Sequence, residues 1–315
     1  MQNTFYCSPD KLNLIMGSAT SAGVFVDDFR QIPLPNRAMI NGIITDVGIM
    51  TDFLERIANE YHLQGGATGE NKLLKNPTRI IIQASNIVTK ILELPPADEA
   101  QIRSFIRREF TQYEDNAETI DTSLYDYTVL NQIGPNGGVE ILAASCGRDM
   151  IEDYRRAFEQ STYNIESIGI AAEALIKLVS LLPGLVGQTY MLAQIEPTRQ
   201  TNTIFIGGTY RISNGYRLIG EAGSAGWISE IGQNLASTLQ FIRAQRGQAE
   251  LSRVFFSGIS PQILETLTRD FAYLNVGMQK FDLSGIVTVS EKVTPDRHFD
   301  PGTLLFNLGA LVKRS

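Results

Sequence analysis

The chain has 315 residues, of which 43% are hydrophobic, and it carries a formal net charge of −7 with a pI near 5. This length suits two modest domains or one bilobed domain, and it is ample for a buried core. The acidic balance argues against nucleic acid or an anionic membrane surface as the main partner, because both attract a positively charged surface. We therefore expect a globular protein with no nucleic acid partner.

The cysteines and histidines indicate a chain without disulfides or bound metal. Cys7 and Cys146 each lie in an apolar, strand-like segment, which favours buried, reduced thiols. His62 and His298 are isolated from other ligand residues, so a zinc site would lack donors. The signature motifs of serine hydrolases, zinc metalloproteases and P-loop enzymes do not occur in the sequence. We expect no catalytic residue and no metal ligand.

No segment of the sequence has the pattern of a targeting or membrane-spanning element. The first ten residues lack the basic start and the apolar run of a signal peptide. The longest apolar stretch, residues 174–187, is interrupted by Lys177 and Pro183 and falls short of the roughly 20 residues that a bilayer span needs. The expected location is the cytoplasm.

Hydrophobic periodicity predicts alternating strands and helices through the first half of the chain. Thr45 or Asp46 is the expected N-cap of the first helix. The glycine-rich residues 134–138 are typical of a hairpin that joins two strands. The expected strands are residues 4–6, 12–16, 23–29, 79–84, 86–94, 124–132, 139–145 and 164–170, and the expected helices are residues 46–61, 98–113, 148–160 and 171–182.

A proline and a glycine at positions 183 and 184 end the first half, and we place a domain boundary at residues 184–188. The second half opens with three short strands around a turn at residues 196–200. Many folds hold a phosphate at such a turn on glycine amides, but this turn carries Glu196 and Pro197 and no glycine. The expected strands are residues 190–195, 201–207, 216–220, 253–256 and 275–281, and the expected helices are residues 224–246, 262–271 and 303–314.

Both halves open with three strands that pair sequentially and then alternate helix and strand, which indicates a repeat of elements rather than of residues. Several stretches make this order specific. They are the turn at residues 40–46, the strand and proline stop at residues 88–96 with the helix at 102–113, residues 139–146 and 164–175, and the closing residues 306–314. In these stretches the chain resembles the PilM family of type IV pilus assembly proteins, which are relatives of the division protein FtsA in the actin-like ATPase superfamily.

The resemblance implies an α/β fold with two actin-like (ribonuclease H-like) lobes. Residues 1–187 would form the first lobe, with an inserted α+β subdomain at about residues 95–163. Residues 188–315 would form the second lobe, whose own insertion is reduced, because Gly220 to Gly226 leads almost directly into the long helix.

The nucleotide motifs of the family are degenerate in this chain. The family's two phosphate turns read Asp-x-Gly, and its adenosine motif is a Gly-Gly pair. The matching positions here are Ser8, Pro9 and Asp10 in the first turn, Gln194 and Glu196 in the second, and Gly258 in the adenosine motif. Glycine permits close approach to a phosphate, whereas Pro197 removes an amide and Glu196 repels a polyphosphate. We expect no ATP or Mg²⁺ and no enzymatic activity.

The partner in the PilM family is the cytoplasmic tail of PilN, a bitopic membrane protein, held between the first lobe and its insertion. Carried over to this chain, the resemblance implies membrane contact through the partner only. The implied partner-binding residues are Ser85, Asn86, Ile87, Val88, Lys90, Arg103, Ile106 and Arg107. The competing interpretation of each is structural: the isoleucines and Val88 as core, and the arginines as a solvated helix face.

Three alternatives stay open at this stage. In the first alternative, the chain is an ATP-binding ATPase with unorthodox motifs. In the second, it is an FtsA-like filament protein that self-associates and attaches to a membrane through its apolar residues 304–312. As a third alternative, the assembly that it serves is a type II secretion system rather than a type IV pilus.

Overall fold

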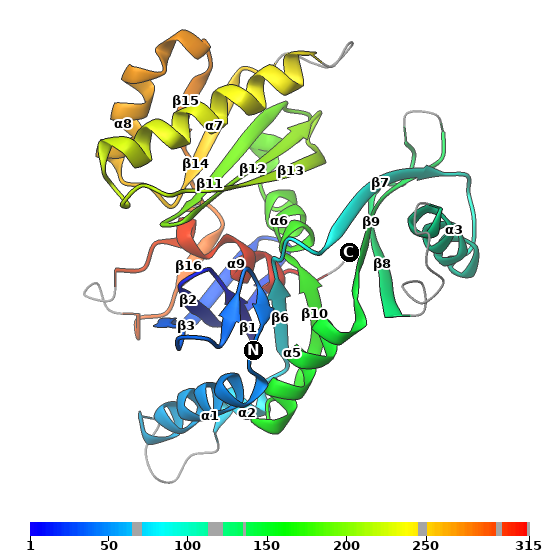
Figure 1. The fold of residues 1–315 in the computed structure, drawn as a ribbon, viewed down its shortest axis with the longest axis vertical. Helices are drawn as coiled ribbons and strands as arrows, with labels where there is room; N and C mark the ends of the chain where they lie inside the picture. The colour runs from blue at the N-terminus through cyan, green and yellow to red at the C-terminus, as the bar shows by residue number, and fades with distance from the viewer. Residues whose placement is uncertain (65–70, 113–121, 135–136, 245–250, 294–297, 314–315) are drawn as a thin grey trace. The chain divides into compact units, whose positions relative to one another are not determined.

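A computed structural model describes residues 1–64, 71–112, 122–134, 137–244, 251–293 and 298–313 (Figure 1). The chain forms two compact units. Unit 1 consists of Met1–Met16 and Arg30–Glu173, and unit 2 consists of Gly17–Phe29 and Ala174–Ser315. The sequence places the start of the second lobe at residue 188, whereas unit 2 starts at Ala174 and also takes in a segment near the N-terminus.

A six-stranded sheet has the order β10-β6-β1-β2-β3-β16, with β6 parallel to both β1 and β10. Strands β2 and β3 form a hairpin whose far end, Gly17–Phe29, belongs to unit 2 together with β16. The strands are β1 Gln2–Cys7, β2 Lys11–Thr20, β3 Gly23–Pro33, β6 Thr78–Ile82, β10 Ile165–Ile170 and β16 Val287–Val289.

A five-stranded sheet in unit 2 has the order β13-β12-β11-β14-β15. Its first three strands are antiparallel neighbours, and β14 and β15 then add in parallel. In the six-stranded sheet, β3, β2, β1, β6 and β10 lie in the same order as β13, β12, β11, β14 and β15 here. The repeat of elements expected from the sequence is therefore a repeat of strand order in the two sheets. The strands are β11 Tyr190–Glu196, β12 Arg199–Ile206, β13 Thr209–Arg217, β14 Arg253–Ser257 and β15 Gly277–Lys280.

Unit 1 carries a third, smaller sheet, which is antiparallel with the order β7-β9-β8. Helix α3 (Glu99–Thr111) packs on one face of this sheet, and Asp98 and Gln101 close its first turn as a capping box. The strands are β7 Val88–Leu94, β8 Ser123–Asn131 and β9 Val139–Gly147. This sheet spans Val88 to Gly147, whereas the resemblance implies an insertion at about residues 95–163.

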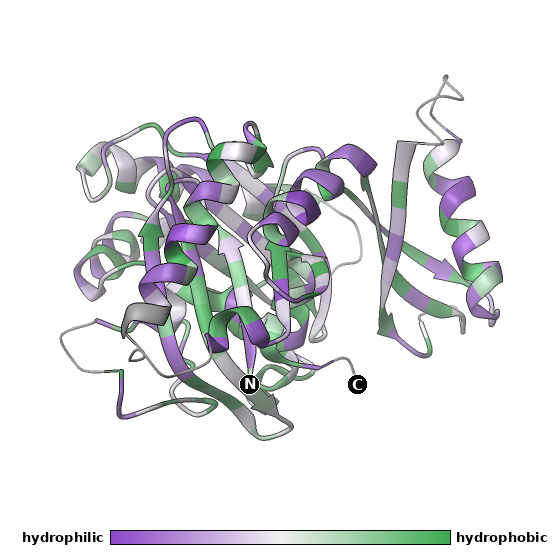
Figure 2. Ribbon diagram, turned by 90° about the horizontal axis from the view of Figure 1, so that it is seen from below, coloured by the Kyte–Doolittle hydropathy of each residue, from purple (hydrophilic) through white to green (hydrophobic). Residues whose placement is uncertain are grey.

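Amphipathic helices bury their apolar faces against the larger sheets (Figure 2). In unit 1, α1 and α5 lie side by side, and Asp46 accepts a hydrogen bond from the amide of Ile49 as the N-cap of α1 (Figure 1). In unit 2, α7 packs against α8 and β12. The helices are α1 Val47–Gln64, α2 Lys72–Lys75, α5 Arg148–Gln160, α6 Ala171–Ser180, α7 Ala225–Ala244, α8 Pro261–Asp270 and α9 Leu305–Leu311.

The structure moves the start of one expected strand and adds a strand that was not expected. The strand expected at residues 216–220 is β13, which begins at Thr209, and Gly207 and Gly208 form the turn before it. Strand β16 was not expected at all. Among the described residues, no helix is both long and apolar enough to cross a bilayer.

Candidate functional site

The first degenerate nucleotide turn is the tip of the β1–β2 hairpin, and its polar atoms bond to one another. The amide of Ser8 donates to the carbonyl of Lys11 at 2.8 Å. The Ser8 hydroxyl lies 3.0 Å from both Asp10 Oδ1 and the Lys11 carbonyl, and it accepts a hydrogen bond from the Lys11 amide. A phosphate group needs free amide donors. This turn instead presents a carboxylate that its own serine already binds.

The second degenerate turn joins β11 to β12, and two neighbouring segments hold it closed. Trp227 Nε1 donates to the carbonyl of Pro197 at 2.9 Å, and the amide of Leu218 donates to the carbonyl of Thr198 at 2.9 Å. Gln194 is buried on β11 and stands opposite Ser257 of β14. The turn therefore offers bonded carbonyl groups and the side chain of Glu196 where a phosphate would need donors.

Gly258, which the resemblance matches to the family's adenosine motif, has a steric reason to be glycine. Its φ angle is +82°, which L side chains rarely adopt, and a Cβ atom there would lie 2.1 Å from the carbonyl oxygen of Ile195. The end of β14 thus passes directly against the end of β11. This glycine is explained by packing alone.

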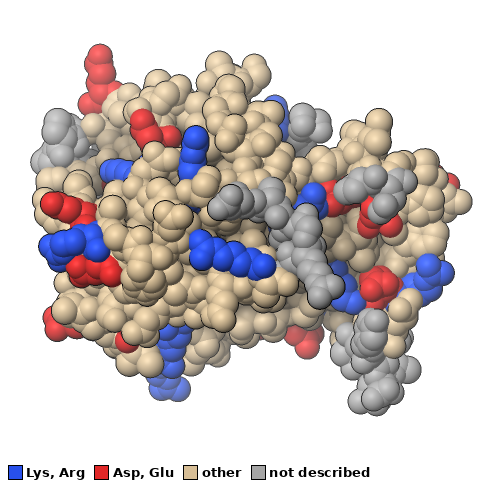
Figure 3. All heavy atoms as spheres, turned by 90° about the horizontal axis from the view of Figure 1, so that it is seen from above, with Lys and Arg blue, Asp and Glu red and all other residues tan. Residues whose placement is uncertain are grey.

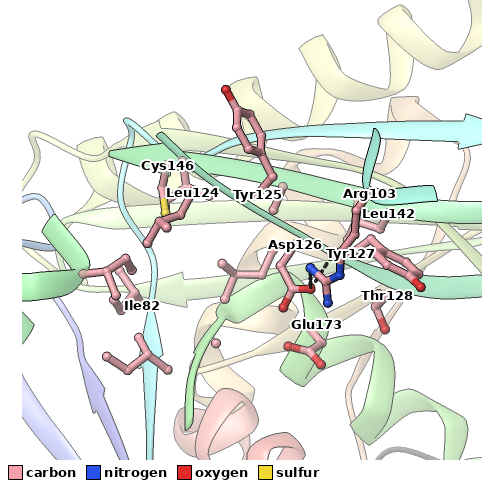
Figure 4. Close-up of a pocket in the computed structure, with 16 residues that line it drawn as sticks. Ile82, Arg103, Leu124, Tyr125, Asp126, Tyr127, Thr128, Leu142, Cys146 and Glu173 are labelled. Atoms are coloured by element: carbon pink, nitrogen blue, oxygen red, sulfur yellow. Dashed lines mark hydrogen bonds and ion pairs between the residues drawn. The ribbon is translucent and has the colours of Figure 1, made fainter. Parts of the chain in front are cut away.

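Unit 1 contains a cavity of about 330 Å³ between the small sheet and the end of the larger one (Figure 4). We refer to it as the groove. Its size falls at the lower end of the range that is typical of ligand sites, roughly 300–1,000 Å³. One wall is formed by residues 124–128 of β8 with alternate residues of β9, and the other by residues 168–170 of β10 with Ile82 and Ile87.

The alternation of side chains in the small sheet sets which of them face the groove. Ile141 and Ala143 of β9 face α3 and join the small core with Ile106. The intervening residues Leu142 and Ala144 turn to the groove. Cys146 follows them on the same side, half-buried, and burial raises the pKa of its thiol. The groove is therefore mostly apolar and contains one thiol.

Three side chains of the acidic and basic residue types line the groove: Arg103, Asp126 and Glu173. Arg103 Nη1 lies 3.7 Å from Asp126 Oδ1, and Nη2 lies 3.0 Å from Glu99 Oε1. The hydrogen bond to Glu99 raises the pKa of the Arg103 guanidinium. Glu173 comes from the first turn of α6, where the helix N-terminus favours a carboxylate. Figure 4 shows Asp126 directed from β8 toward the side of the groove on which Glu173 lies.

The structure distributes the predicted partner-binding residues over several environments. Ile87 and Arg103 line the groove. Ile106 is a buried residue of α3. Lys90 Nζ lies 3.3 Å from Glu109 Oε1. The remaining residues are exposed and do not line the groove: Ser85, Asn86, Val88 and Arg107.

Sequence reasoning missed most of the groove. The walls come from β6, β8, β9, β10, α3, α5 and α6. The sequence predicted these strands and helices but not that they meet around one cavity. The single signal available for Glu173 was its position after an apolar strand. On the face seen in Figure 3, described Lys and Arg side chains lie interspersed with Asp and Glu side chains. No group of three or more His, Cys, Asp or Glu in the described part of the chain is arranged to hold a metal ion.

No family model matches this sequence, and no curated protein does. Among solved structures, the chain is similar to one in a PilM–PilN type IV pilus biogenesis complex, with 12% identity, 99% of each chain covered and a TM-score of 0.76. A protein of unknown function with an actin-like ATPase fold from Bacteroides thetaiotaomicron matches with 11% identity, 99% of this chain and 96% of that chain covered, and a TM-score of 0.53.

A third match is the cytoplasmic domain of EpsL, an inner membrane component of the type II secretion system of Vibrio cholerae. It has 8% identity, covers 99% of this chain and 95% of that chain, and gives a TM-score of 0.51. Identities this low establish the fold and leave the function to be argued from the site. The chain therefore has a two-lobed actin-like ATPase fold and is structurally similar to PilM.

Proposed function

We propose that this protein is a non-catalytic, actin-like scaffold that binds a short cytoplasmic segment of a PilN-like membrane protein in the groove of unit 1. The carrying observation is the groove itself: an apolar cavity beside strand edges, containing two of the residues that the resemblance to PilM implies. Extended peptides bind by adding to strand edges and placing alternate side chains in pockets. The protein would act in the cytoplasm and reach the inner membrane through this partner.

The two closed turns support a scaffold without nucleotide chemistry. The Ser8–Asp10 turn is satisfied by its own hydrogen bonds, and Trp227 and Leu218 occupy the carbonyl groups of the Pro197 turn. Binding of Mg-ATP would require both turns to open and two carboxylates to accept a polyphosphate. The alternative of an ATPase therefore finds no support in the geometry of these residues.

The alternative of a C-terminal membrane anchor is also weakened. All seven residues of α9 are buried within unit 2. A Cβ atom on Gly309 would lie within 2 Å of the carbonyl oxygen of Ala174, so α9 packs directly against the start of α6. A helix held in this way stabilises the fold and has no free apolar face for a bilayer.

The experiment is thiol footprinting with the cytoplasmic tail of the PilN-like protein from the same organism. The sequence has two cysteines, and only Cys146 lines the groove, while Cys7 is buried in the core of unit 1. We expect the tail peptide to slow alkylation of Cys146 at least tenfold at saturation and to leave the slow reaction of Cys7 unchanged. Calorimetry with Mg-ATP should give no heat of binding.

Two matched variants locate the effect. Ala144→Phe fills the groove and should abolish protection of Cys146, whereas Ser104→Phe adds the same side chain on the exposed face of α3 and should preserve it. Equal tail affinity for both variants would contradict the assignment of the groove. Micromolar Mg-ATP binding, about −8 kcal/mol, would contradict the loss of nucleotide binding.

A further inference from the structure

The outward face of α7, the long helix of unit 2, is neutral, unlike that of α5 (Figure 1). Two of the 20 residues of α7 are charged, whereas seven of the 13 residues of α5 are. Glu230 accepts hydrogen bonds from the amides of Ile219 and Gly220. Arg243 donates to the carbonyl of Leu274 at 2.9 Å. The outward stripe consists of exposed or partly exposed residues at helical spacing: Gly226, Ser229, Gln233, Ser237, Gln240 and Ala244.

Beside the start of α7, Ile219 is an exposed apolar residue that its own loop holds in place. It is 84% exposed, although the neighbouring Leu218 is buried and donates its amide to the carbonyl of Thr198. The amide of Ile219 itself donates to Glu230 Oε2 at 2.8 Å. Single exposed apolar residues are common on protein surfaces. An isoleucine fixed outward in this way, however, contacts a partner without the cost of ordering a loop.

Phe241 lies on the same flank of α7 as Ile219. It follows Glu230, which holds Ile219, by 11 residues, and this spacing is about three helical turns and about 16 Å along the axis. Phe241 is 47% exposed. The flank therefore carries one apolar side chain at each end. Such a surface fits a copy of itself turned by half a rotation, because Ile219 of one copy then meets Phe241 of the other at both ends.

Charge and size favour a second copy as the occupant of this face. The chain carries a net charge of −7, so two copies repel each other on average. On α7 one acid and one base balance, and two copies meet there without that repulsion. With one row of neighbouring side chains on either side, α7 covers roughly 30 by 25 Å, close to the roughly 800 Å² that each partner contributes to a specific interface.

We propose that two copies of this protein pair through α7 in antiparallel orientation. The two-fold axis passes between Leu235 and Ala236, midway between Glu230 and Phe241. Because the stripe is polar in its middle, we expect a dissociation constant of about 10 μM, at the weak end for an interface of this size. The pair is closed and is not the start of a filament. It joins two copies of the groove in one particle, whatever the groove binds.

Sedimentation equilibrium of the full chain between about 1 and 100 μM measures the association, because this range brackets the expected dissociation constant. We expect the mass to rise from 34.8 kDa toward twice that value and no further.

Two variants and a matched control locate the contact. Phe241→Glu and Ile219→Glu should each weaken the association by about tenfold or more, because each places a carboxylate in both apolar contacts of the pair. Val186→Glu is the control: it changes another exposed apolar residue of unit 2, 72% exposed and outside α7, and should associate as the wild type does. Trp227 fluorescence reports whether unit 2 is folded in each variant.

The antiparallel orientation has its own test, in chains that also carry Cys146→Ala and retain only the buried Cys7. Ser229 and Gln240 lie on the outward stripe on opposite sides of the proposed axis, so each meets the other across the pair. A mixture of Ser229→Cys and Gln240→Cys chains should form a disulfide-linked dimer on mild oxidation. Neither variant should do so alone, because its two equivalent thiols lie about 14–20 Å apart along the axis.

Four results would overturn the proposal. A mass that stays at 34.8 kDa at the highest concentration shows that no pair forms. Growth beyond two chains contradicts a closed pair. Unchanged association of both Phe241→Glu and Ile219→Glu assigns the contact to another surface. Cross-linking of Ser229→Cys or Gln240→Cys alone, to the same extent as in the mixture, contradicts the antiparallel orientation.

Discussion

The two larger sheets share a strand order but join their helices in different ways. In unit 1, β1 and α5 meet through aromatic rings. Phe5, Phe158 and Tyr163 pack edge to face, with ring centroids 5.1–5.5 Å apart. In unit 2 the helix α7 meets β12 through a buried polar network around Asn202 and Thr238. The same topology is therefore compatible with two different interiors, and strand order alone does not determine what a unit can do.

The polar network in unit 2 is continuous from strand to helix. Asn202 Nδ2 donates to Thr238 Oγ1 at 2.9 Å, and Gln200 Nε2 donates to Asn202 Oδ1 at 2.9 Å. Asn234 Nδ2 donates to Gln200 Oε1, and Tyr216 shares a hydrogen bond with Thr238. Such a network is fully hydrogen-bonded in only one alignment of α7 on β12, because each side-chain amide must meet its own partner. Apolar contacts tolerate small shifts, so unit 2 is the more strictly specified unit.

The two units also carry separate reporters. Trp227 is the only tryptophan in the sequence and lies in unit 2, on α7. Both cysteines lie in unit 1, Cys7 in its core and Cys146 in the groove. Fluorescence and thiol reactivity therefore follow the two units independently in one sample.

The largest effect is expected from Phe158→Ala, which removes the centre of the aromatic contact in unit 1. A buried phenylalanine replaced by alanine costs about 3–5 kcal/mol of unfolding free energy, from lost burial and the cavity left behind. Denaturant unfolding measured by pulsed alkylation of Cys7 should show this loss. Phe241→Ala, on an exposed part of α7, is the matched control and should change little. A loss below 1 kcal/mol would show that the aromatic contact is not central.

A smaller effect is expected from Asn202→Leu, which should destabilise unit 2 by about 2 kcal/mol. The substitution leaves the buried amide of Gln200 short of a partner, and unsatisfied buried groups cost roughly 1–3 kcal/mol. Trp227 fluorescence during urea unfolding measures it. The double variant with Thr238→Val should cost less than the sum of the two single variants, because both remove the same bond. Strict additivity would argue against a coupled network.

The smallest effect concerns alkaline pH and separates the units again. Burial raises the pKa of the Cys7 thiol from 9.0 to about 12. A raised pKa contributes stability that is present below about pH 9 and is lost between pH 9 and pH 12. Cys7→Ala should therefore reduce the fall in stability of unit 1 between pH 8 and pH 10 by roughly 1 kcal/mol. Cys146→Ala, at a half-buried thiol, is the control. An unchanged slope in Cys7→Ala would contradict the burial argument.

Sequence patterns predicted the elements with strong periodicity and failed where pairing with a neighbouring strand decides the structure. The helix at residues 148–160 was predicted with its observed bounds, because Met150, Tyr154 and Phe158 repeat on one face. Strand β13 was placed too late because Ser213, Asn214 and Gly215 look like a turn. In the sheet these three pair with β12, and the neighbour outweighs their low strand propensity.

The groove shows the same limit at the level of a site. Ile87 and Arg103 were predicted through the resemblance to a family, and the groove contains both. Glu173 and the residues of β8 were not predicted as site residues, because they meet only when β8 and β10 lie on either side of one cavity. Side-chain chemistry is local, whereas a cavity is a property of the assembled chain.

Strand β16 has a consequence for the synthesis of the protein. It pairs with Val24, Phe25 and Val26 near the N-terminus, and Thr288 bonds to the carbonyl of Val24 across 264 positions of sequence. At 5–20 residues per second, a ribosome needs roughly 13–50 s to make the intervening chain. During that time the outer edge of β3 has no paired strand, so Val24–Val26 is the part of this edge at which the nascent chain can pair wrongly.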